Sequence, residues 1–313
     1  MTPALAVDAG QTEIRVALAG ERDTHRAARA PGVLRIDGAA VGADKVAGAL
    51  VAAVGELGPL PAVEAIGVGL SGFEAARDED LRHVEEVLRA RVGAARVTIA
   101  SDGVTSLLGA LGERLGAVVA AGTGTVCVAR GPRGWAKVDG WGSLLGDAGS
   151  GFAIGRAGLD AALRELDGRR GSRALLAAAE QRFGEPTGIV EAVHRSPAPT
   201  RTVASFAQDV AQVAAEGDPL ARSILEDAGR ELALTACAAL ERAFDRGEAV
   251  AVSYSGSVFA AGLLLDEFAR ELASRRPDAQ LLPPEADALA GAALLAERGQ
   301  ALMQDREMLW SAA

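Results

Sequence analysis

The segment VDAGQTEIRVA (residues 7–17) returns 112 residues later as VAAGTGTVCVA (119–129), with five of the eleven positions identical. Each copy reads as an apolar strand, a turn containing glycine and threonine, and a second apolar strand. Two such hairpins in related halves of one chain would face each other across a cleft and offer N–H groups and hydroxyls to an anion. The repeat therefore predicts two similar halves that hold a polyphosphate between them.

Five short apolar runs end in small or acidic turns, and helical patterns separate them. The runs are ALAVDAG (4–10), EAIGVGLSG (64–72), VTIASDG (97–103), AVVAAGTG (117–124) and AVAVSYSGS (249–257). Helical patterns cover 43–57, 76–91, 151–166, 200–216 and 286–304. A longer helix is expected from Asp218 as N-cap, with Pro219 first in the helix, to about Phe244. We predict an α/β protein whose ligands gather where the strands end.

Composition and charge limit which kinds of molecule this protein is expected to bind. A chain of 313 residues with 49% hydrophobic and 24% charged residues suits two ordinary globular domains. The net charge of -10 argues against nucleic acid or an anionic membrane as partner, so a bound phosphate is expected to need a metal ion. No apolar stretch is long enough to cross a bilayer, and MTPALAVDAG carries no basic leader or cleavage site. The expected compartment is the cytoplasm.

The cysteines and histidines do not form a reactive constellation in the sequence. Cys127 and Cys237 lie in separate apolar patterns and are expected to be buried. His25, His83 and His194 are far apart, without the spacing of a zinc site or a Ser/His/Asp group. Hydrolytic catalysis of these kinds is therefore not expected.

Five segments, taken in order, resemble one known family. They are DAGQT (8–12), SDG (101–103), AGTGT (121–125), GWGSLLGDAGSGFAIGR (140–156) and SGSVF (255–259). They resemble the BadF/BadG-type ATPase family and, within it, the N-acetylglucosamine kinases of the actin/hexokinase/Hsp70 superfamily. The resemblance covers nearly the whole chain, and 140–156 is its most specific part.

The resemblance implies an α/β fold of two ribonuclease-H-like, actin-like ATPase lobes with a nucleotide cleft between them. The lobes are expected at 1–112 and 113–296, with a C-terminal helix of about 297–313 packing back on the first. ATP with Mg²⁺ would bind in the cleft, and the protein would be a kinase that phosphorylates the 6-hydroxyl of N-acetylglucosamine or glucosamine. A homodimer is also implied.

The nucleotide is expected to bind at both hairpins and at one late turn. By resemblance Asp8 holds Mg²⁺, usually through water, against the phosphates; its alternative role is to bond its own backbone in a turn. Glycines allow the backbone to approach the phosphates, and hydroxyls contact them; without a ligand the same residues would simply make tight turns. The remaining cofactor-binding residues are Gly10, Gln11, Thr12, Gly122, Thr123 and Gly124, with Gly256 and Ser257 beside the adenosine.

Asp102 is the expected catalytic residue. It follows the apolar run VTIAS and precedes a helical pattern, so its alternative role is that of a helix N-cap. In the kinase interpretation, which we favour, its carboxylate is the general base that accepts the sugar hydroxyl proton.

The glycine-rich stretch 139–155 is expected to bind the sugar. Gly140 and Gly142 flank Trp141, whose ring would pack on the apolar sugar face, although a lone tryptophan more often packs in a core. Asp147 would accept hydrogen bonds from sugar hydroxyls. A helix starting near Phe152 would point free N–H groups back toward the cleft. Ser71, Thr123 and Asp102 complete the expected substrate-binding set.

The sequence departs from the family pattern in three places. Gln11 and Glu13 stand where the family has glycine and a basic residue, so we expect modest phosphate affinity. APGVLRIDG (30–38) lacks the asparagine that touches the amino sugar, and Val126 replaces a second asparagine. These losses bear on acetamido specificity more than on kinase chemistry.

Two other functions would use the same fold. Activators of 2-hydroxyacyl-CoA dehydratases need exposed cysteines for an iron–sulfur cluster, which Cys127 and Cys237 do not supply. A nucleotide-dependent sensor or scaffold would keep the hairpins without turnover, and the presence of Asp102 argues against it.

Overall fold

The computed structural model describes residues 3–10, 13–19, 27–32, 42–73, 76–302 and 309–310. The chain divides into a first unit, Met1–Arg114 with Pro283–Ala313, and a second unit, Leu115–Leu282. Each unit contains a β-sheet with its own hydrophobic core. The mixed α/β class expected from the sequence is confirmed.

The sheet of the first unit has the strand order β11-β5-β4-β1-β2-β3. The strands are β1 (Ala4–Ala9), β2 (Glu13–Ala19), β3 (Ala27–Pro31), β4 (Ala65–Leu70), β5 (Arg96–Ser101) and β11 (Leu309–Trp310). Strands β1, β4 and β5 are parallel, and Ala9, Leu70 and Ser101 stand level across them. The residues that follow these three strands therefore leave the sheet at one edge.

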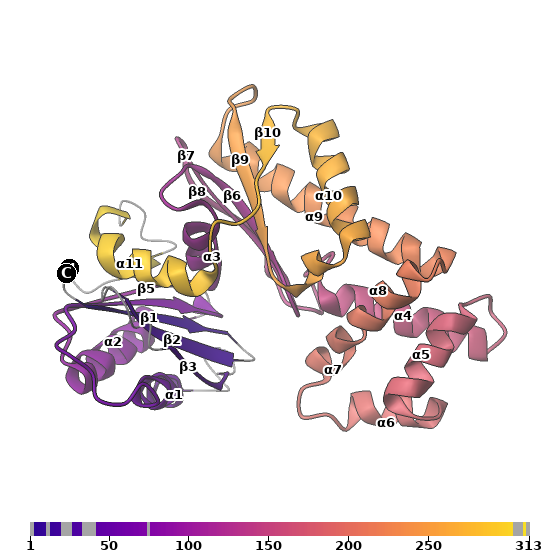
Figure 1. Ribbon diagram of the computed structural model, residues 1–313, viewed down its shortest axis with the longest axis horizontal. Helices are drawn as coiled ribbons and strands as arrows, with labels where there is room; N and C mark the ends of the chain where they lie inside the picture. The colour runs from indigo at the N-terminus through magenta and orange to yellow at the C-terminus, as the bar shows by residue number, and fades with distance from the viewer. Residues whose placement is uncertain are drawn as a thin grey trace. The chain divides into compact units, whose positions relative to one another are not determined.

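Helices cover both faces of this sheet. Helices α1 (Ala43–Gly55) and α2 (Asp78–Val92) lie on one face, and α3 (Asp102–Leu111) and α11 (Ala288–Leu302) on the other (Figure 1). Helix α11 packs so tightly that a Cβ on Gly67 of β4 would lie 2.1 Å from the Ala292 carbonyl oxygen. The segment after Pro283 is thus built into the fold of the first unit.

The sheet of the second unit has the strand order β10-β9-β6-β7-β8. Its strands are β6 (Gly116–Ala121), β7 (Thr125–Gly131), β8 (Gly134–Asp139), β9 (Val250–Ser255) and β10 (Ala279–Leu281). These five strands match the first sheet without β11: in the order β10-β9-β6-β7-β8 they correspond to β5-β4-β1-β2-β3, with the same parallel and antiparallel pairings. The repeat seen in the two hairpins therefore extends over five strands.

Helices of the second unit pack beside its sheet and on one another (Figure 1). They are α4 (Gly151–Leu166), α5 (Arg173–Phe183), α6 (Pro186–His194), α7 (Pro199–Ser205), α8 (Ala207–Ala215), α9 (Pro219–Ala243), α10 (Gly262–Arg275) and a short 3₁₀ turn, η2 (Ser257–Ala260). Helix α9 begins as expected, because the Asp218 carboxylate accepts hydrogen bonds from the N–H groups of Leu220 and Ala221 at 3.0 and 2.8 Å.

One helical pattern forms two helices. The stretch 200–216 divides into α7 and α8 at Phe206, whose side chain is fully buried. The Phe206 ring stands 6.1 Å from that of Phe183 and lies against Gly158, where a Cβ would approach it to 3.1 Å. Burial of this ring accounts for the break, which sequence periodicity does not record.

Within the described parts of the chain, the helices are too short or too polar to span a membrane.

Candidate active site

Three expected site residues of the first unit stand at the same edge of its sheet. Gly10, Ser71 and Asp102 each follow the carboxyl end of a parallel strand, β1, β4 or β5. The Ser71 N–H donates to the Ala9 carbonyl oxygen at 3.0 Å, and the Gly10 N–H closes the first hairpin on the Glu13 carbonyl at 3.0 Å. Gln11 and Thr12 lie outside the described residues. Gly10 and Ser71 are 61 positions apart in the sequence and Ser71 and Asp102 are 31 apart, and the parallel register brings all three to one edge.

Asp102 is the first residue of α3, and the residue before it makes the cap. The Ser101 hydroxyl accepts a hydrogen bond from the Gly103 N–H at 3.4 Å, which is the N-cap interaction. The capping interpretation of Asp102 is therefore wrong. Asp102 is half-buried at the start of α3, and its role as general base stays a prediction.

Asp8 forms an ion pair that the sequence analysis missed. Arg15, its cross-strand partner on β2, donates from Nε and Nη2 to Asp8 Oδ2 at 3.0 and 2.5 Å. The same guanidinium donates from Nη1 to Asp287 Oδ2 at 2.6 Å. Burial nevertheless raises the pKa of Asp8 above its ordinary value, with Arg15 opposing that shift. The hairpin register, which places residue 15 opposite residue 8, was the signal that could have revealed this pair.

The residues near Asp8 fit a magnesium ion that keeps most of its own ligands. Among the described residues, no three His, Cys, Asp or Glu side chains gather as a metal site. Mg²⁺ needs only one or two carboxylates when phosphates and waters complete its shell. The half-buried Asp8 carboxylate, held in place by Arg15 and near that of Asp287, suits this water-mediated mode better than a metal site built from protein ligands alone.

The turn of the second hairpin contacts the start of α4. The N–H groups of Gly151 and Phe152 donate to the carbonyl oxygens of Gly122 and Thr123 at 2.8 and 3.1 Å. The next N–H, that of Ala153, donates to the Ser150 hydroxyl at 3.2 Å. The expectation of free N–H groups at this helix start is wrong, because the turn carbonyls and the Ser150 cap accept their hydrogen bonds. The hydrogen bonds to the turn carbonyls hold the turn against the helix.

Trp141 does not pack in a core. Its side chain is 71% exposed, and Leu144 and Leu145 on the same loop are exposed at 94% and 87%. Gly140 and Gly142 adopt φ of 76° and 85°, values that favour glycine. The Lys137 ammonium lies 5.8 Å from the centre of the Trp141 ring. The core-packing alternative is therefore wrong, and an exposed ring is available to stack on a ligand.

Asp147 is brought against the hairpin turn. Its side chain is buried, and a Cβ on Gly124 would lie 2.7 Å from Asp147 Oδ2. Any side chain at Gly124 would therefore clash with the Asp147 carboxylate, a constraint that local sequence patterns do not reveal. Thr123, Gly124 and Asp147 thus lie close together in the second unit.

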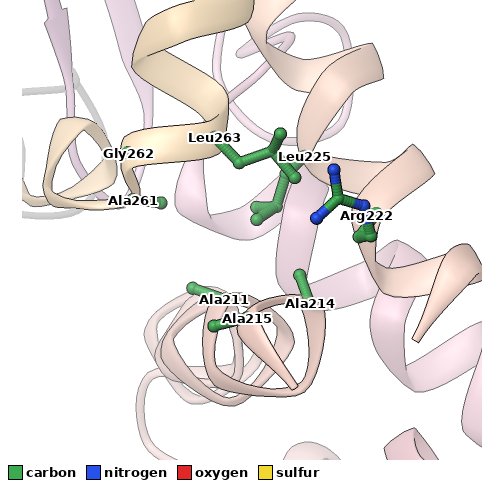
Figure 2. A pocket seen from close by; sticks show the side chains of 8 residues that line it. All are labelled: Ala211, Ala214, Ala215, Arg222, Leu225, Ala261, Gly262 and Leu263. Atoms are coloured by element: carbon green, nitrogen blue, oxygen red, sulfur yellow. The ribbon is translucent and has the colours of Figure 1, made fainter. Parts of the chain in front are cut away.

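The late turn at Gly256 and Ser257 lies at the same end of the second sheet. A Cβ on Gly256, whose φ is 98°, would lie 2.2 Å from the Ala121 carbonyl oxygen, at the end of β6. The 3₁₀ turn η2 follows and leads into α10. Beside it is a hollow of about 100 Å³ (Figure 2), lined by Ala211, Ala214, Ala215, Arg222, Leu225 and residues 261–263. This hollow is mostly apolar, with one guanidinium at its side.

Both cysteines are buried, as expected. Burial raises the pKa of each thiol, so neither resembles a reactive or cluster-binding thiolate.

Comparison with known proteins identifies the family. The family model of the BadF/BadG/BcrA/BcrD ATPases matches residues 5–296. An N-acetylmuramic acid/N-acetylglucosamine kinase of Clostridium acetobutylicum is 30% identical over 249 residues, covering 78% of this chain and 80% of the relative. An N-acetyl-D-glucosamine kinase of Dictyostelium discoideum is 28% identical over 246 residues, covering 75% of each chain.

A solved structure supports the same assignment. The crystal structure of a Chromobacterium violaceum protein, provisionally named an N-acetylglucosamine kinase, has 29% identity and a TM-score of 0.73. The match covers 95% of this chain and 99% of that one. These relatives bear the names of kinases, which confirms the enzyme class expected from the sequence. With a family model matched over most of its length and two repeated sheets that end in the expected turns, this chain belongs to the BadF/BadG/BcrA/BcrD ATPase family.

Proposed function

We propose that this protein transfers the γ-phosphoryl group of ATP to the 6-hydroxyl of an amino sugar, N-acetylglucosamine or glucosamine. The observation that carries the proposal is the parallel register that sets Gly10, Ser71 and Asp102 at one edge of the first sheet. A phosphate-binding turn, a sugar-binding serine and a candidate base are what phosphoryl transfer to an alcohol needs together.

In this proposal Asp102 is the general base. Its carboxylate accepts the proton of the sugar 6-hydroxyl as that oxygen forms a bond to the γ-phosphorus. The bond between the γ-phosphorus and the bridging oxygen breaks, and ADP leaves with that electron pair. Mg²⁺ would neutralise charge on the phosphates, and Asp8 would be the residue that holds it. The role of Arg15 is to keep the Asp8 carboxylate in a fixed orientation.

The second unit supplies groups for both substrates. Trp141 offers an exposed ring to the apolar face of the sugar, and Asp147 accepts hydrogen bonds from its hydroxyls. Gly122 has open space where a Cβ would stand, which leaves room for phosphate oxygens at the turn. The hollow beside η2 is smaller than a whole ligand pocket and suits a flat base, with Arg222 along its side (Figure 2).

The sugar is proposed from the names of the relatives as well as from the site. One relative is named for both N-acetylmuramic acid and N-acetylglucosamine, so both sugars belong in a substrate panel. Because the family asparagines are missing at 30–38 and at Val126, we expect a weak preference for the acetylated sugar over glucosamine.

The test is a measurement of ADP release with ATP, Mg²⁺ and a panel of N-acetylglucosamine, glucosamine, N-acetylmuramic acid and glucose. We expect at least one amino sugar to stimulate ADP release, a chelator to abolish it, and phosphorus-coupled NMR to locate the phosphate on oxygen 6. Nucleotide binding without stimulation by any sugar would instead indicate the sensor or scaffold function.

Two further properties are proposed on the resemblance alone: the two units serve as the two lobes of the kinase, and the protein forms a homodimer. We also propose that it works in the cytoplasm, the compartment expected from the sequence. Light scattering of the purified protein tests the dimer.

A further inference from the structure

Asp139, the last residue of β8, closes the loop that contains Trp141. Its Oδ1 accepts hydrogen bonds from the N–H groups of Gly140 and Asp147, both at 2.8 Å. Its Oδ2 accepts a hydrogen bond from the Ala148 N–H at 3.0 Å. One carboxylate therefore ties the first residue of the loop to the residues at its far end.

The same carboxylate determines the packing inside the loop. A Cβ on Gly146 would lie 2.5 Å from Asp139 Oδ1 and 3.0 Å from the Trp141 Cβ. Gly146 also donates its N–H to the Gly142 carbonyl oxygen at 2.8 Å. The backbone that carries the exposed Trp141 ring is thus packed on the Asp139 carboxylate through Gly146.

Asp147 depends on Asp139 for its backbone. Asp139 and Asp147 have φ of 63° and 60°, a left-handed conformation that costs energy in residues other than glycine. The hydrogen bond between Asp139 Oδ1 and the Asp147 N–H joins these two positions. The Asp147 side chain is placed from the other direction, by its contact with Gly124.

We propose that Asp139 is a positioning residue of the sugar site. It holds the Trp141 ring and the Asp147 carboxylate at a fixed separation, so that one can stack on a sugar while the other accepts its hydroxyls. The inference rests on the proposed function and extends it. Both oxygens of Asp139 accept hydrogen bonds from backbone N–H groups, so Asp139 acts on the sugar through its neighbours.

The first variant is Asp139→Asn, which tolerates the left-handed conformation but replaces one acceptor oxygen with an N–H₂ donor. Losing a charge-assisted hydrogen bond between Asp139 and the backbone at the end of the loop should raise the KM for the sugar roughly ten- to a hundredfold. The KM for ATP and the kcat at saturating sugar should stay close to wild type. Emission from the exposed Trp141, read against a Trp141→Phe background, should also change.

Asp218→Asn is the matched control. Asp218 is a carboxylate of the same unit that also accepts two backbone N–H groups, at the start of α9 and away from this loop. It should lower the melting temperature without changing the KM for the sugar. Gly146→Ala approaches Asp139 from the other side, because its new Cβ must displace the carboxylate. It should raise the KM for the sugar in the same way, so the inference stays testable if Asp139→Asn folds poorly.

A double-mutant cycle decides whether Asp139 acts through Asp147. If it does, Asp139→Asn should add little to the loss caused by Asp147→Ala. Fully additive effects, or an unchanged KM for the sugar in both Asp139→Asn and Gly146→Ala, would overturn the inference while leaving the kinase intact. A wild-type protein that phosphorylates no sugar would overturn the proposed function itself, and the role of Asp139 with it.

Discussion

At the scale of single residues, Asp102 and Asp78 form a natural comparison, because each is the first residue of a helix in the first unit. Asp102→Asn keeps the shape but cannot accept a proton, so turnover should fall roughly 10²–10⁴-fold, the usual range for a general base. Binding of ATP, measured by calorimetry, should persist. Asp78→Asn removes a helix-start carboxylate without touching the chemistry and should retain full turnover. Equal turnover in both variants would refute the role of Asp102.

The pair of Asp8 and Arg15 leads to a pH-dependent prediction. Burial raises the pKa of Asp8 above 3.8, so the folded protein binds this proton more tightly than the unfolded chain does. Ionisation of Asp8 therefore lowers stability, and this loss develops as the pH rises above the unfolded pKa. Arg15 limits the loss by pairing with the carboxylate, of which only 14% is exposed.

Arg15→Gln should therefore destabilise the protein more at neutral pH than in acid. We expect the free energy of unfolding to fall by about 1–3 kcal/mol at neutral pH, because a largely buried carboxylate loses its partner. The difference from wild type should shrink as the pH falls from about 7 to about 4 in urea titrations. Asp8→Asn combined with Arg15→Gln should abolish this pH dependence. A difference that is constant with pH would mean that Asp8 is not the group involved.

At the scale of elements, the turn between β6 and β7 offers two glycines with different surroundings. A Cβ at Gly124 would meet the Asp147 carboxylate at 2.7 Å, whereas one at Gly122 would meet nothing within 4 Å. Gly124→Ala should therefore displace Asp147 and raise the KM for the sugar roughly five- to a hundredfold, the cost of weakened hydrogen bonds. Gly122→Ala should raise the KM for ATP instead, because its methyl group enters the space proposed for phosphate. Steady-state kinetics with each substrate varied would show this reversal; the same effect on both KM values would contradict it.

Several helices and strands could be predicted from local sequence patterns. The strands at 4–9, 65–70, 96–101, 116–121 and 250–255 follow from the sequence because each contains an apolar run that ends in a distinct turn. Helix α9 was expected because Asp218 and Pro219 mark its start chemically. The break at Phe206 was not expected, because only burial of its ring against Gly158 and Phe183 decides it.

At the scale of the whole molecule, two separate cores predict two separable responses to core mutations. Leu50 of α1 and Leu240 of α9 are fully buried, each in the core of its own unit. Leu50→Ala and Leu240→Ala should each remove about 2–5 kcal/mol from the unit that contains the change. In scanning calorimetry, each variant should then lower the unfolding temperature of its own unit and leave that of the other unit close to wild type. Identical shifts of one single transition would mean that the two units unfold as one cooperative whole.

The class of the fold, the repeated hairpins and the family could all be predicted from the sequence alone. The fold class depends on short-range patterns of apolar runs, turn residues and helix caps, whereas the repeat and the family resemblance depend on such short segments recurring in a fixed order along the chain. It also predicted that ligands would gather where the strands end, and the structure places Gly10, Ser71 and Asp102 there because parallel strands bring their carboxyl ends to one edge.

The contacts that hold the site residues in place could not be predicted from the sequence. Arg15 on Asp8, Gly124 against Asp147, and the turn carbonyls on the first N–H groups of α4 are contacts between segments that local patterns do not link. The exposure of Trp141 and the three hydrogen bonds to Asp139 likewise depend on the path of the folded loop. Hydrogen bonds and close approaches are specific to atoms within a few ångströms, and that proximity exists only once the chain has folded.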